Sequence, residues 1–216
     1  LYNEKSSLEY AKMHEGFMKS FKSEGFMKSF KSEYIDSLST TNENNEVDFS
    51  NVIDFHIESG MSVIPMVISG DAGMGKTTVM AQCSLSYFSR LEDKLDHFLS
   101  MDEGMPSLPL PVVLKAKRFP SPSLPKFVVD SNPELLKHIS FEEIMQLFET
   151  WSSMKDLHNS SMVFFVDGVD ECATKNDAKA MFEMVKSSSH SSNDKSVLII
   201  STRPSHEDVV FESLPR

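Results

Sequence analysis

The sequence predicts an α/β fold: a mostly parallel sheet with helices on both faces, which together form a three-layer sandwich. Two observations predict this fold. From residue 61 onward, short apolar segments rich in β-branched residues alternate with longer segments whose apolar side chains recur at helical spacing. The short segments are apolar almost throughout, as is typical of strands buried on both faces of a parallel sheet. Strands that alternate with helices favour a parallel sheet.

Residues 1–60 differ from this pattern, because they are polar and rich in Lys, Glu, Ser and Asn. Within them, residues 16–24 and residues 25–33 both read GFMKSFKSE. A repeat of this length turns an α-helix by about 900°, so two copies in one helix would point their Phe side chains in opposite directions. We therefore expect a break at Gly25 or a loosely ordered amphipathic arm. The segment is either a partner-binding helix or a recent duplication in a tolerant linker, and residues 40–48 read as a polar linker.

The first half of the α/β region predicts two strands and one helix. Residues 62–69 (SVIPMVIS) predict the first strand, with Pro65 marking its start or an irregularity. Residues 76–91 predict a helix, and residues 111–119 (PVVLKAKRF) predict the second strand. Residues 120–125, rich in Pro and Ser, predict a loop.

The second half continues the alternation. A helix is expected over residues 140–156, a third strand over residues 161–166 and another helix over residues 173–187. A Ser-rich loop over residues 187–194 then leads to a fourth strand over residues 196–202. In the helix over residues 140–156, the apolar side chains at helical spacing are expected in the core; they are Phe141, Ile144, Met145, Phe148 and Trp151.

The composition disfavours some classes of ligand and indicates the cellular compartment. The formal net charge of −11 disfavours binding to nucleic acid or anionic membranes, so an anionic ligand needs a local positive site. Two cysteines, Cys83 and Cys172, give no disulfide framework, which favours a cytoplasmic protein; we expect both to be structural. No apolar run is long enough to span a bilayer, and the His residues show no zinc-ligand spacing.

A glycine-rich motif follows the first predicted strand. Residues 70–77 read GDAGMGKT, which fits G-x-x-x-x-G-K-[ST], the Walker A motif or P-loop. Glycines let the backbone turn its N–H groups toward a phosphate, and the helix that follows adds a favourable dipole. Lys76 would neutralise the β and γ phosphate oxygens, and Thr77 would offer its hydroxyl to Mg²⁺. The expected ligands are therefore ATP or GTP with Mg²⁺, bound by Gly70, Asp71, Ala72, Gly73, Met74, Gly75, Lys76, Thr77 and Thr78.

Acidic residues follow the third predicted strand, in the segment MVFFVDGVDE. Ligands of open α/β sheets bind at the carboxyl ends of the strands, so Asp167 fits the Walker B role of holding Mg²⁺. Gly168 would give the turn beside the phosphates. Asp170 or Glu171 could then activate the attacking water. We favour Glu171 as the base and Asp170 as a supporting or Mg²⁺-linked residue, although the sequence alone does not separate them.

The fourth predicted strand ends in the residues STRP. If this strand lies next to the P-loop strand, Arg203 or Thr202 points toward the γ-phosphate. A cation or donor at that place distinguishes ATP from ADP. The alternative is a surface Arg at the end of a strand.

Three motifs occur in this order: GDAGMGKTT, FFVDGVDE and IISTRP. Together they resemble the NACHT NTPase domain of the signal-transduction ATPases with numerous domains. This class includes the NOD-like receptors. The small residue after the Walker B acid and the following Asp-Glu pair carry most of the resemblance, which spans roughly residues 61–205. It implies a P-loop NTPase sandwich that binds ATP, or sometimes GTP, with Mg²⁺. It further implies phosphate binding by the P-loop, an Mg²⁺ role for Asp167, Asp170 and Glu171, and a sensor role for Arg203.

The resemblance also implies a conformational switch: ADP holds a closed monomer, and ATP permits self-association with slow hydrolysis. Such domains occur in cytoplasmic proteins of innate immunity and cell-death regulation, beside effector and repeat domains of the same receptor. A complete domain has a further core strand on the other flank of the P-loop strand, followed by helical and winged-helix parts. We expect residues 61–216 to be a partial NACHT domain, truncated before its last core strand. We further expect the isolated chain to bind nucleotide weakly or to fold poorly.

Two other functions are compatible with a P-loop. A kinase for a small substrate needs a basic lid, whereas residues 92–107 are acidic. A binding module that has lost hydrolysis would lack the acids, whereas all of them are present here. The sequence therefore favours the switch NTPase.

Overall fold

The computed structural model describes residues 4–21, 53, 65–100, 109–158, 161–188 and 196–213. Within them four strands form one sheet, namely β1 (Pro65–Ser69), β2 (Leu110–Lys115), β3 (Met162–Asp167) and β4 (Val197–Thr202). Their order is β1-β4-β3-β2, and every pair is parallel. The predicted α/β fold of the P-loop NTPase type is thereby confirmed. The last of the described strands, β4, lies between β1 and β3.

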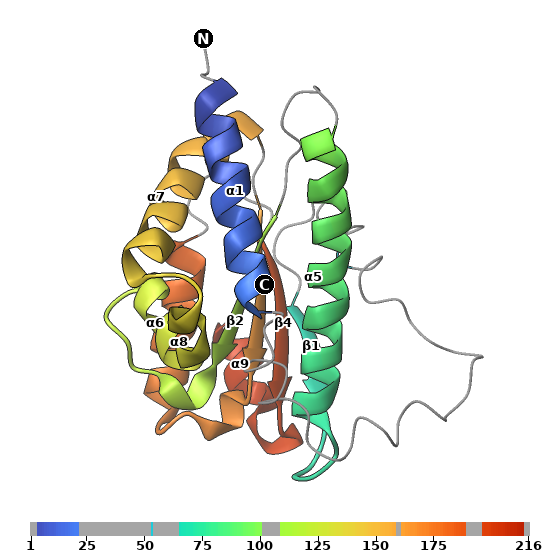
Figure 1. Cartoon of the computed structure of the whole chain (residues 1–216). Helices are drawn as coiled ribbons and strands as arrows, with labels where there is room; N and C mark the ends of the chain where they lie inside the picture. Colours follow the sequence, from blue (N-terminus) through green and yellow to red (C-terminus); the bar gives the residue numbers. More distant parts are fainter. Residues whose placement is uncertain are drawn as a thin grey trace, which may run out of the picture.

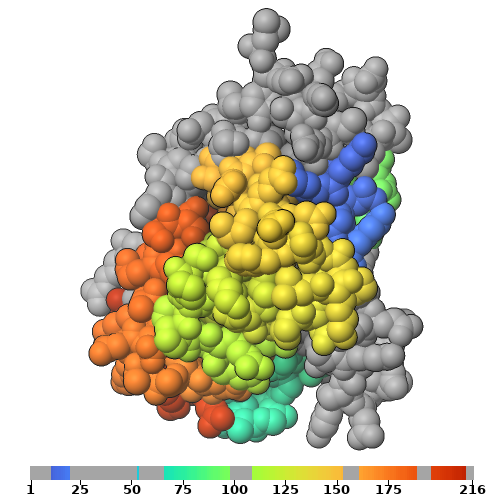
Figure 2. Space-filling view, turned by 60° about the vertical axis from the view of Figure 1, so that its left-hand side comes forward, coloured from blue at the N-terminus to red at the C-terminus, as the bar shows by residue number. Residues whose placement is uncertain are grey.

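Helices cover both faces of the sheet. Helix α5 (Lys76–Ser100) contacts all four strands from one side, as Figure 1 shows on the right. On the other side lie α6 (Leu124–Ser131), α7 (Phe141–His158) and α8 (Lys175–Ser187). Figure 2 shows these three helices side by side on the surface of that face. Helix α9 (Glu207–Ser213) packs against α8.

The core lies between the layers and explains the continuous apolar strands. Every residue of β4 is buried, and β3 is buried up to Val166, the residue before Asp167. Tyr87 and Phe88 of α5 both contact the ring of Phe165 from β3, with centroid distances of 6.1 and 6.2 Å. Burial of an aromatic side chain contributes a few kcal/mol, so these contacts fix α5 on the sheet.

Helix α1 (Glu4–Phe21) lies between α5 and α7 and packs against both, as seen at the front of Figure 1. Phe17 is fully buried and meets Phe148 of α7 edge to face, with 6.4 Å between the ring centroids. His14 is buried beside them; its Nε2 donates to the carbonyl of Pro109 over 3.1 Å, and burial lowers the pKa of His14 to about 4. Phe17 and Met18 belong to the first repeat copy, so that copy contributes to the core. The second copy lies outside the described residues, and the domain boundary near residue 60 stays a prediction.

Two predicted elements end at clearly different residues in the structure. Helix α5 extends to Ser100 rather than residue 91, because Leu91 and Leu95 continue its buried face. The second strand ends at Lys115 rather than residue 119. Lys115 still pairs with Asp167 of β3, and its backbone N–H donates to Ser131 Oγ over 2.9 Å. The chain then forms a 3₁₀ turn, η1 (Ala116–Arg118).

The predicted Pro- and Ser-rich loop contains the start of a helix. Ser123 caps α6 by accepting from the backbone N–H of Lys126, and Pro125 lies in the first turn, where a missing N–H costs nothing. A second 3₁₀ segment, η2 (Pro133–Lys137), connects α6 to α7. Ser and Pro are common in loops, but Ser123 and Pro125 equally fit the first turn of a helix.

The apolar stripe of α7 is confirmed in part. Ile144, Phe148 and Trp151 are buried, whereas Met145 is half-buried and Phe141 is exposed. Phe141 is the first residue of the helix, so it projects past the layer that covers the sheet. No helix among the described residues combines the length and apolar character that a membrane span requires.

Phe17→Ala tests whether α1 is part of the folded core. Removal of this fully buried ring is expected to lower the free energy of unfolding by about 3–5 kcal/mol, as measured by urea denaturation. Lys12→Ala, an exposed change on the same helix, is the matched control and should shift the free energy by at most about 0.5 kcal/mol. Equal effects of the two substitutions would show that α1 does not belong to the cooperative unit.

Candidate functional site

The P-loop connects β1 to α5 at the carboxyl edge of the sheet. Gly73 and Gly75 have φ angles of 79° and 76°, a backbone conformation that strongly favours glycine. Helix α5 begins at Lys76, so its unpaired N–H groups and its positive dipole end face the same place as the loop. This arrangement is suited to a phosphate, as the sequence predicts.

The Lys76 ammonium is held over the loop. Its Nζ donates to the carbonyl oxygens of Gly70 over 2.7 Å and Asp71 over 3.0 Å. An ammonium group has three N–H donors, so two contacts with the loop leave one donor for a ligand. A cation at the start of a helix, in a chain of net charge −11, supplies the local positive site that an anionic ligand needs.

Asp167 is the last residue of β3 and joins three parts of the site. Its Oδ1 accepts from Thr77 Oγ1 over 3.2 Å and from Ser201 Oγ over 2.6 Å. Ser201 in turn accepts from the backbone N–H of Gly168 over 2.8 Å. Because β4 lies between β1 and β3, Ser201 reaches both the Walker B acid and the turn after it.

The turn after Asp167 requires glycine. Gly168 has φ 71° and ψ 52°, in the left-handed region. A Cβ added at Gly168 would lie 3.2 Å from Cδ and 3.3 Å from Cγ of Glu171, so the Glu171 side chain lies directly over this residue. The next residues form the short 3₁₀ helix η3 (Val169–Glu171), which carries both acids.

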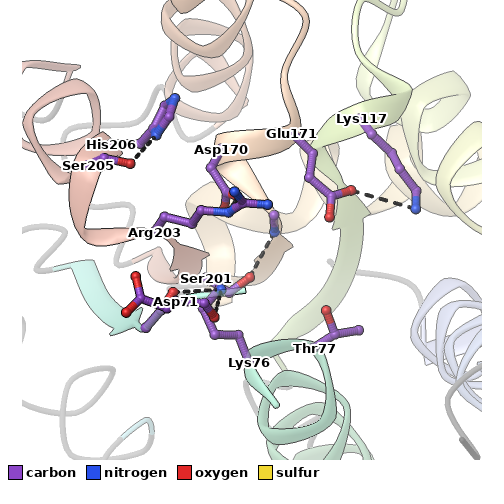
Figure 3. Close-up of polar contacts among 12 residues, drawn as sticks. Asp71, Lys76, Thr77, Lys117, Asp170, Glu171, Ser201, Arg203, Ser205 and His206 are labelled. Atoms are coloured by element: carbon purple, nitrogen blue, oxygen red, sulfur yellow. Dashed lines mark hydrogen bonds and ion pairs between the residues drawn. The ribbon is translucent and has the colours of Figure 1, made fainter. Parts of the chain in front are cut away.

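The two acids of η3 occupy different environments. The Asp170 side chain is 5% exposed, and its Oδ2 lies 2.8 Å from Arg203 Nε. The Glu171 side chain is 50% exposed, and its Oε2 lies 3.6 Å from Lys117 Nζ. Figure 3 shows the two pairs on opposite sides of η3. A buried carboxylate requires a partner, which Arg203 supplies, whereas Glu171 stays open to solvent and ligand.

These side chains surround one cleft of about 340 Å³, a volume within the range of small-molecule sites. It brings together most of the predicted site residues and omits Gly70, Asp71 and Met74. Thr202 is buried outside the cleft, because side chains alternate along a strand and Ser201 takes the cleft side of β4. The lining residues are Ala72, Gly73, Gly75, Lys76, Thr77, Thr78, Asp167, Gly168, Asp170, Glu171, Ser201 and Arg203.

The oxygen pair of Thr77 and Asp167 suits Mg²⁺. Magnesium prefers hard oxygen ligands and is usually held by one or two protein groups together with water and phosphate. The described residues contain no group of three or more His, Cys, Asp or Glu side chains that would make an all-protein cage. A hydroxyl and a carboxylate 3.2 Å apart at the mouth of the P-loop therefore fit this ion.

Burial also shifts the pKa of Lys115 and of the two cysteines. Burial lowers the pKa of Lys115, and the nearby charges of Lys117 and Arg118 lower it further. Burial raises the pKa of both Cys83 and Cys172 to about 11, so both remain thiols at neutral pH. Neither sulfur has the thiolate character of a nucleophile, which agrees with the structural role expected for them.

Two residues that contact the acids of the cleft, Ser201 and Lys117, fall outside the sequence prediction of the site. Ser201 precedes the predicted Thr202 and Arg203, and the period of two along a buried strand was the signal that could have selected it. The sequence predicts a strand through Lys117, whereas the structure places this residue on η1 beside Glu171. No pattern in the sequence relates residue 117 to residue 171, because that proximity follows from the pairing of β2 with β3.

Comparison with known proteins gives little further information. No family model matches the chain, and no curated protein matches it. The chain is similar to a protein in a structure of Drosophila ORC bound to DNA, with 18% sequence identity and a TM-score of 0.37. The match covers 72% of this chain and 37% of that one, so this chain spans well under half the length of its neighbour. A similarity this low carries no argument about function.

Gly168→Ala tests the turn that places Glu171. A Cβ here meets both a left-handed backbone and the Glu171 side chain, so the substitution is expected to lower the free energy of unfolding by about 1–2 kcal/mol. Gly16→Ala is the matched control: an added Cβ meets nothing within 4 Å on the surface of α1, and helix propensity should make the change neutral or stabilising. Urea denaturation measures both. A Gly168→Ala protein as stable as the Gly16→Ala protein would contradict this description of the turn.

Proposed function

We propose that this chain is a nucleotide-binding switch domain that takes ATP, with GTP as the alternative, together with Mg²⁺. One observation carries the proposal: separate elements deliver to a single cleft the side chains that triphosphate chemistry requires. The P-loop and α5 supply a cation and a hydroxyl, β3 and η3 supply carboxylates, and the end of β4 supplies a guanidinium. These residues are Lys76, Thr77, Asp167, Glu171 and Arg203.

Phosphate binding follows from the loop. Backbone N–H groups from the loop at Gly73 and Gly75 and from the start of α5 would point to the same phosphate. Lys76 adds a full positive charge beside them. Thr77 and Asp167 would hold Mg²⁺, which would neutralise phosphate charge and orient the phosphates when bound. Ser201 keeps the Asp167 carboxylate turned toward Thr77.

Hydrolysis is assigned to Glu171. In this reaction the oxygen of a water molecule attacks the γ-phosphorus, the bond to the β–γ bridging oxygen breaks, and Glu171 accepts the proton of the water. The half-exposed carboxylate lines the cleft, whereas Asp170 is buried and paired with Arg203. Asp170 is therefore a supporting residue. It orients Arg203, which lines the cleft and has further N–H donors with which it would sense the γ-phosphate.

The order of GDAGMGKTT, DGVDE and STRP supports a finer proposal, a NACHT-type switch of a NOD-like-receptor-type signalling protein. In such a protein the bound nucleotide sets the conformation, and hydrolysis is slow in the full-length chain. The proposal includes a cytoplasmic location, self-association in the ATP state, and a role in innate immunity or cell-death regulation beside other domains of the same receptor.

Lys76→Ala tests nucleotide binding. Loss of the charge-assisted contacts is expected to weaken the binding of Mg·ATP roughly ten- to a hundredfold, as measured by titration with a fluorescent ATP analogue. Lys94→Ala removes an exposed Lys from the same helix and should leave the affinity unchanged. If both variants bind as the unsubstituted chain does, the cleft is not the nucleotide site.

Glu171→Gln tests the base. The amide keeps the shape of the side chain but no longer accepts a proton, so the release of γ-phosphate is expected to slow by about 10²–10⁴-fold. The affinity for Mg·ATP should remain within about twofold, since the Lys76 and Thr77 contacts are untouched. A variant that releases phosphate as fast as the unsubstituted chain would remove Glu171 from the catalytic role.

A further inference from the structure

We propose that Lys117 is a positioning residue for Glu171 and sets the rate of hydrolysis without contributing to nucleotide affinity. The inference rests on the proposed hydrolytic function. Lys117 belongs to no nucleotide-binding motif and lies on η1, which follows β2 at the far edge of the sheet.

The contact is direct. Lys117 Nζ lies 3.6 Å from Glu171 Oε2, and Figure 3 shows the ammonium on the side of Glu171 that is opposite to Arg203. Glu171 lines the cleft, whereas Lys117 does not. Lys117 can therefore influence a bound nucleotide through Glu171 but has no place in the phosphate site itself.

Glu171 is restrained from two directions. Its side chain lies over Gly168: a Cβ added to Gly168 would lie 3.2 Å from Cδ of Glu171. The carboxylate end then lies 3.6 Å from the ammonium of Lys117, within ion-pair distance. A base must lie within hydrogen-bond reach of the water that it deprotonates, and an ångström of misplacement is costly. Among the described residues, the Glu171 carboxylate has an ion pair with Lys117 alone, so Lys117→Met would remove the charged partner of this group.

One side-chain hydrogen bond connects the turns that carry the two residues. Cys172 Sγ donates to the carbonyl of Ala116 over 3.6 Å, which links the residue after Glu171 to the residue before Lys117. The η1 turn is closed by the backbone N–H of Phe119, which donates to the same carbonyl over 3.0 Å. The ammonium is thus carried by a turn that is attached to η3.

Because Lys117 and Glu171 are both about half exposed, a positioning role of Lys117 can be tested without a large change in the stability of the fold. Lys117 and Glu171 are 55% and 50% exposed, and ion pairs in such places contribute little to folding. Arg118, the next residue, is exposed and has no ion pair within the described part of the chain. Arg118→Met therefore makes the same change in net charge one residue away and serves as the matched control.

The test measures γ-phosphate release and Mg·ATP affinity for the whole chain and three variants. Lys117→Met is expected to lower kcat roughly ten- to a hundredfold, with the ATP affinity and melting temperature unchanged. Lys117→Arg keeps a cation and should restore most of the rate, whereas Arg118→Met should leave rate and affinity unchanged. In the Glu171→Gln background, Lys117→Met should have no further effect, because both substitutions act through the same carboxylate.

The outcomes are distinguishable. If the unsubstituted chain binds ATP and releases no phosphate, the hydrolytic function fails and the role of Lys117 fails with it. If the unsubstituted chain hydrolyses ATP and Lys117→Met does so at the same rate, only the positioning role is overturned. A loss of affinity equal to the loss of rate would place Lys117 in nucleotide binding and would also overturn the proposal.

Discussion

The site depends on one carboxylate. Asp167 Oδ1 accepts hydrogen bonds from Thr77 at the start of α5 and from Ser201 on β4. This carboxylate therefore connects the P-loop to β4, the strand that lies between β1 and β3. These contacts exist because β1, β4 and β3 are adjacent and parallel, with their carboxyl ends at one edge of the sheet. If β1 and β3 paired directly, no hydroxyl from β4 would lie between the loop and the acid. The order of the strands therefore sets the geometry of the candidate Mg²⁺ site.

Around this carboxylate, burial distinguishes residues that look alike in the sequence. Asp170 and Glu171 are neighbours with the same charge, yet one is buried against Arg203 and the other is half-exposed beside Lys117. The left-handed turn at Gly168 starts η3 and turns the two acids toward different cations. Two ion pairs thus attach η3 to the ends of β4 and β2. Any ligand that contacts Arg203 or Glu171 would act on this loop, a property that a nucleotide-dependent switch needs.

Much of this arrangement could be predicted from the sequence, because it depends on local patterns. The apolar strands, the glycines of the P-loop and the acid at the end of β3 are each encoded within a few residues. Ser201 and Lys117 were missed because their roles depend on which strands are neighbours. Helix α6 was not predicted, because Ser123 caps a helix and Pro125 lies in its first turn where the composition indicates a loop. The burial of Phe17 was missed because α1 packs on helices far along the chain, and a polar segment with a repeat gives no sign of that partner.

The dependence of nucleotide binding on Mg²⁺ tests the central claim most directly. ATP is titrated into the chain with Mg²⁺ and with EDTA, and then into Asp167→Asn and into Asp93→Asn, an exposed control on α5. If Thr77 and Asp167 hold the ion, Mg²⁺ should strengthen binding roughly tenfold or more in the unsubstituted chain and in Asp93→Asn. Asp167→Asn should lose most of that gain. Equal affinity with and without Mg²⁺ in the unsubstituted chain, or an undiminished Mg²⁺ effect in Asp167→Asn, would contradict the account.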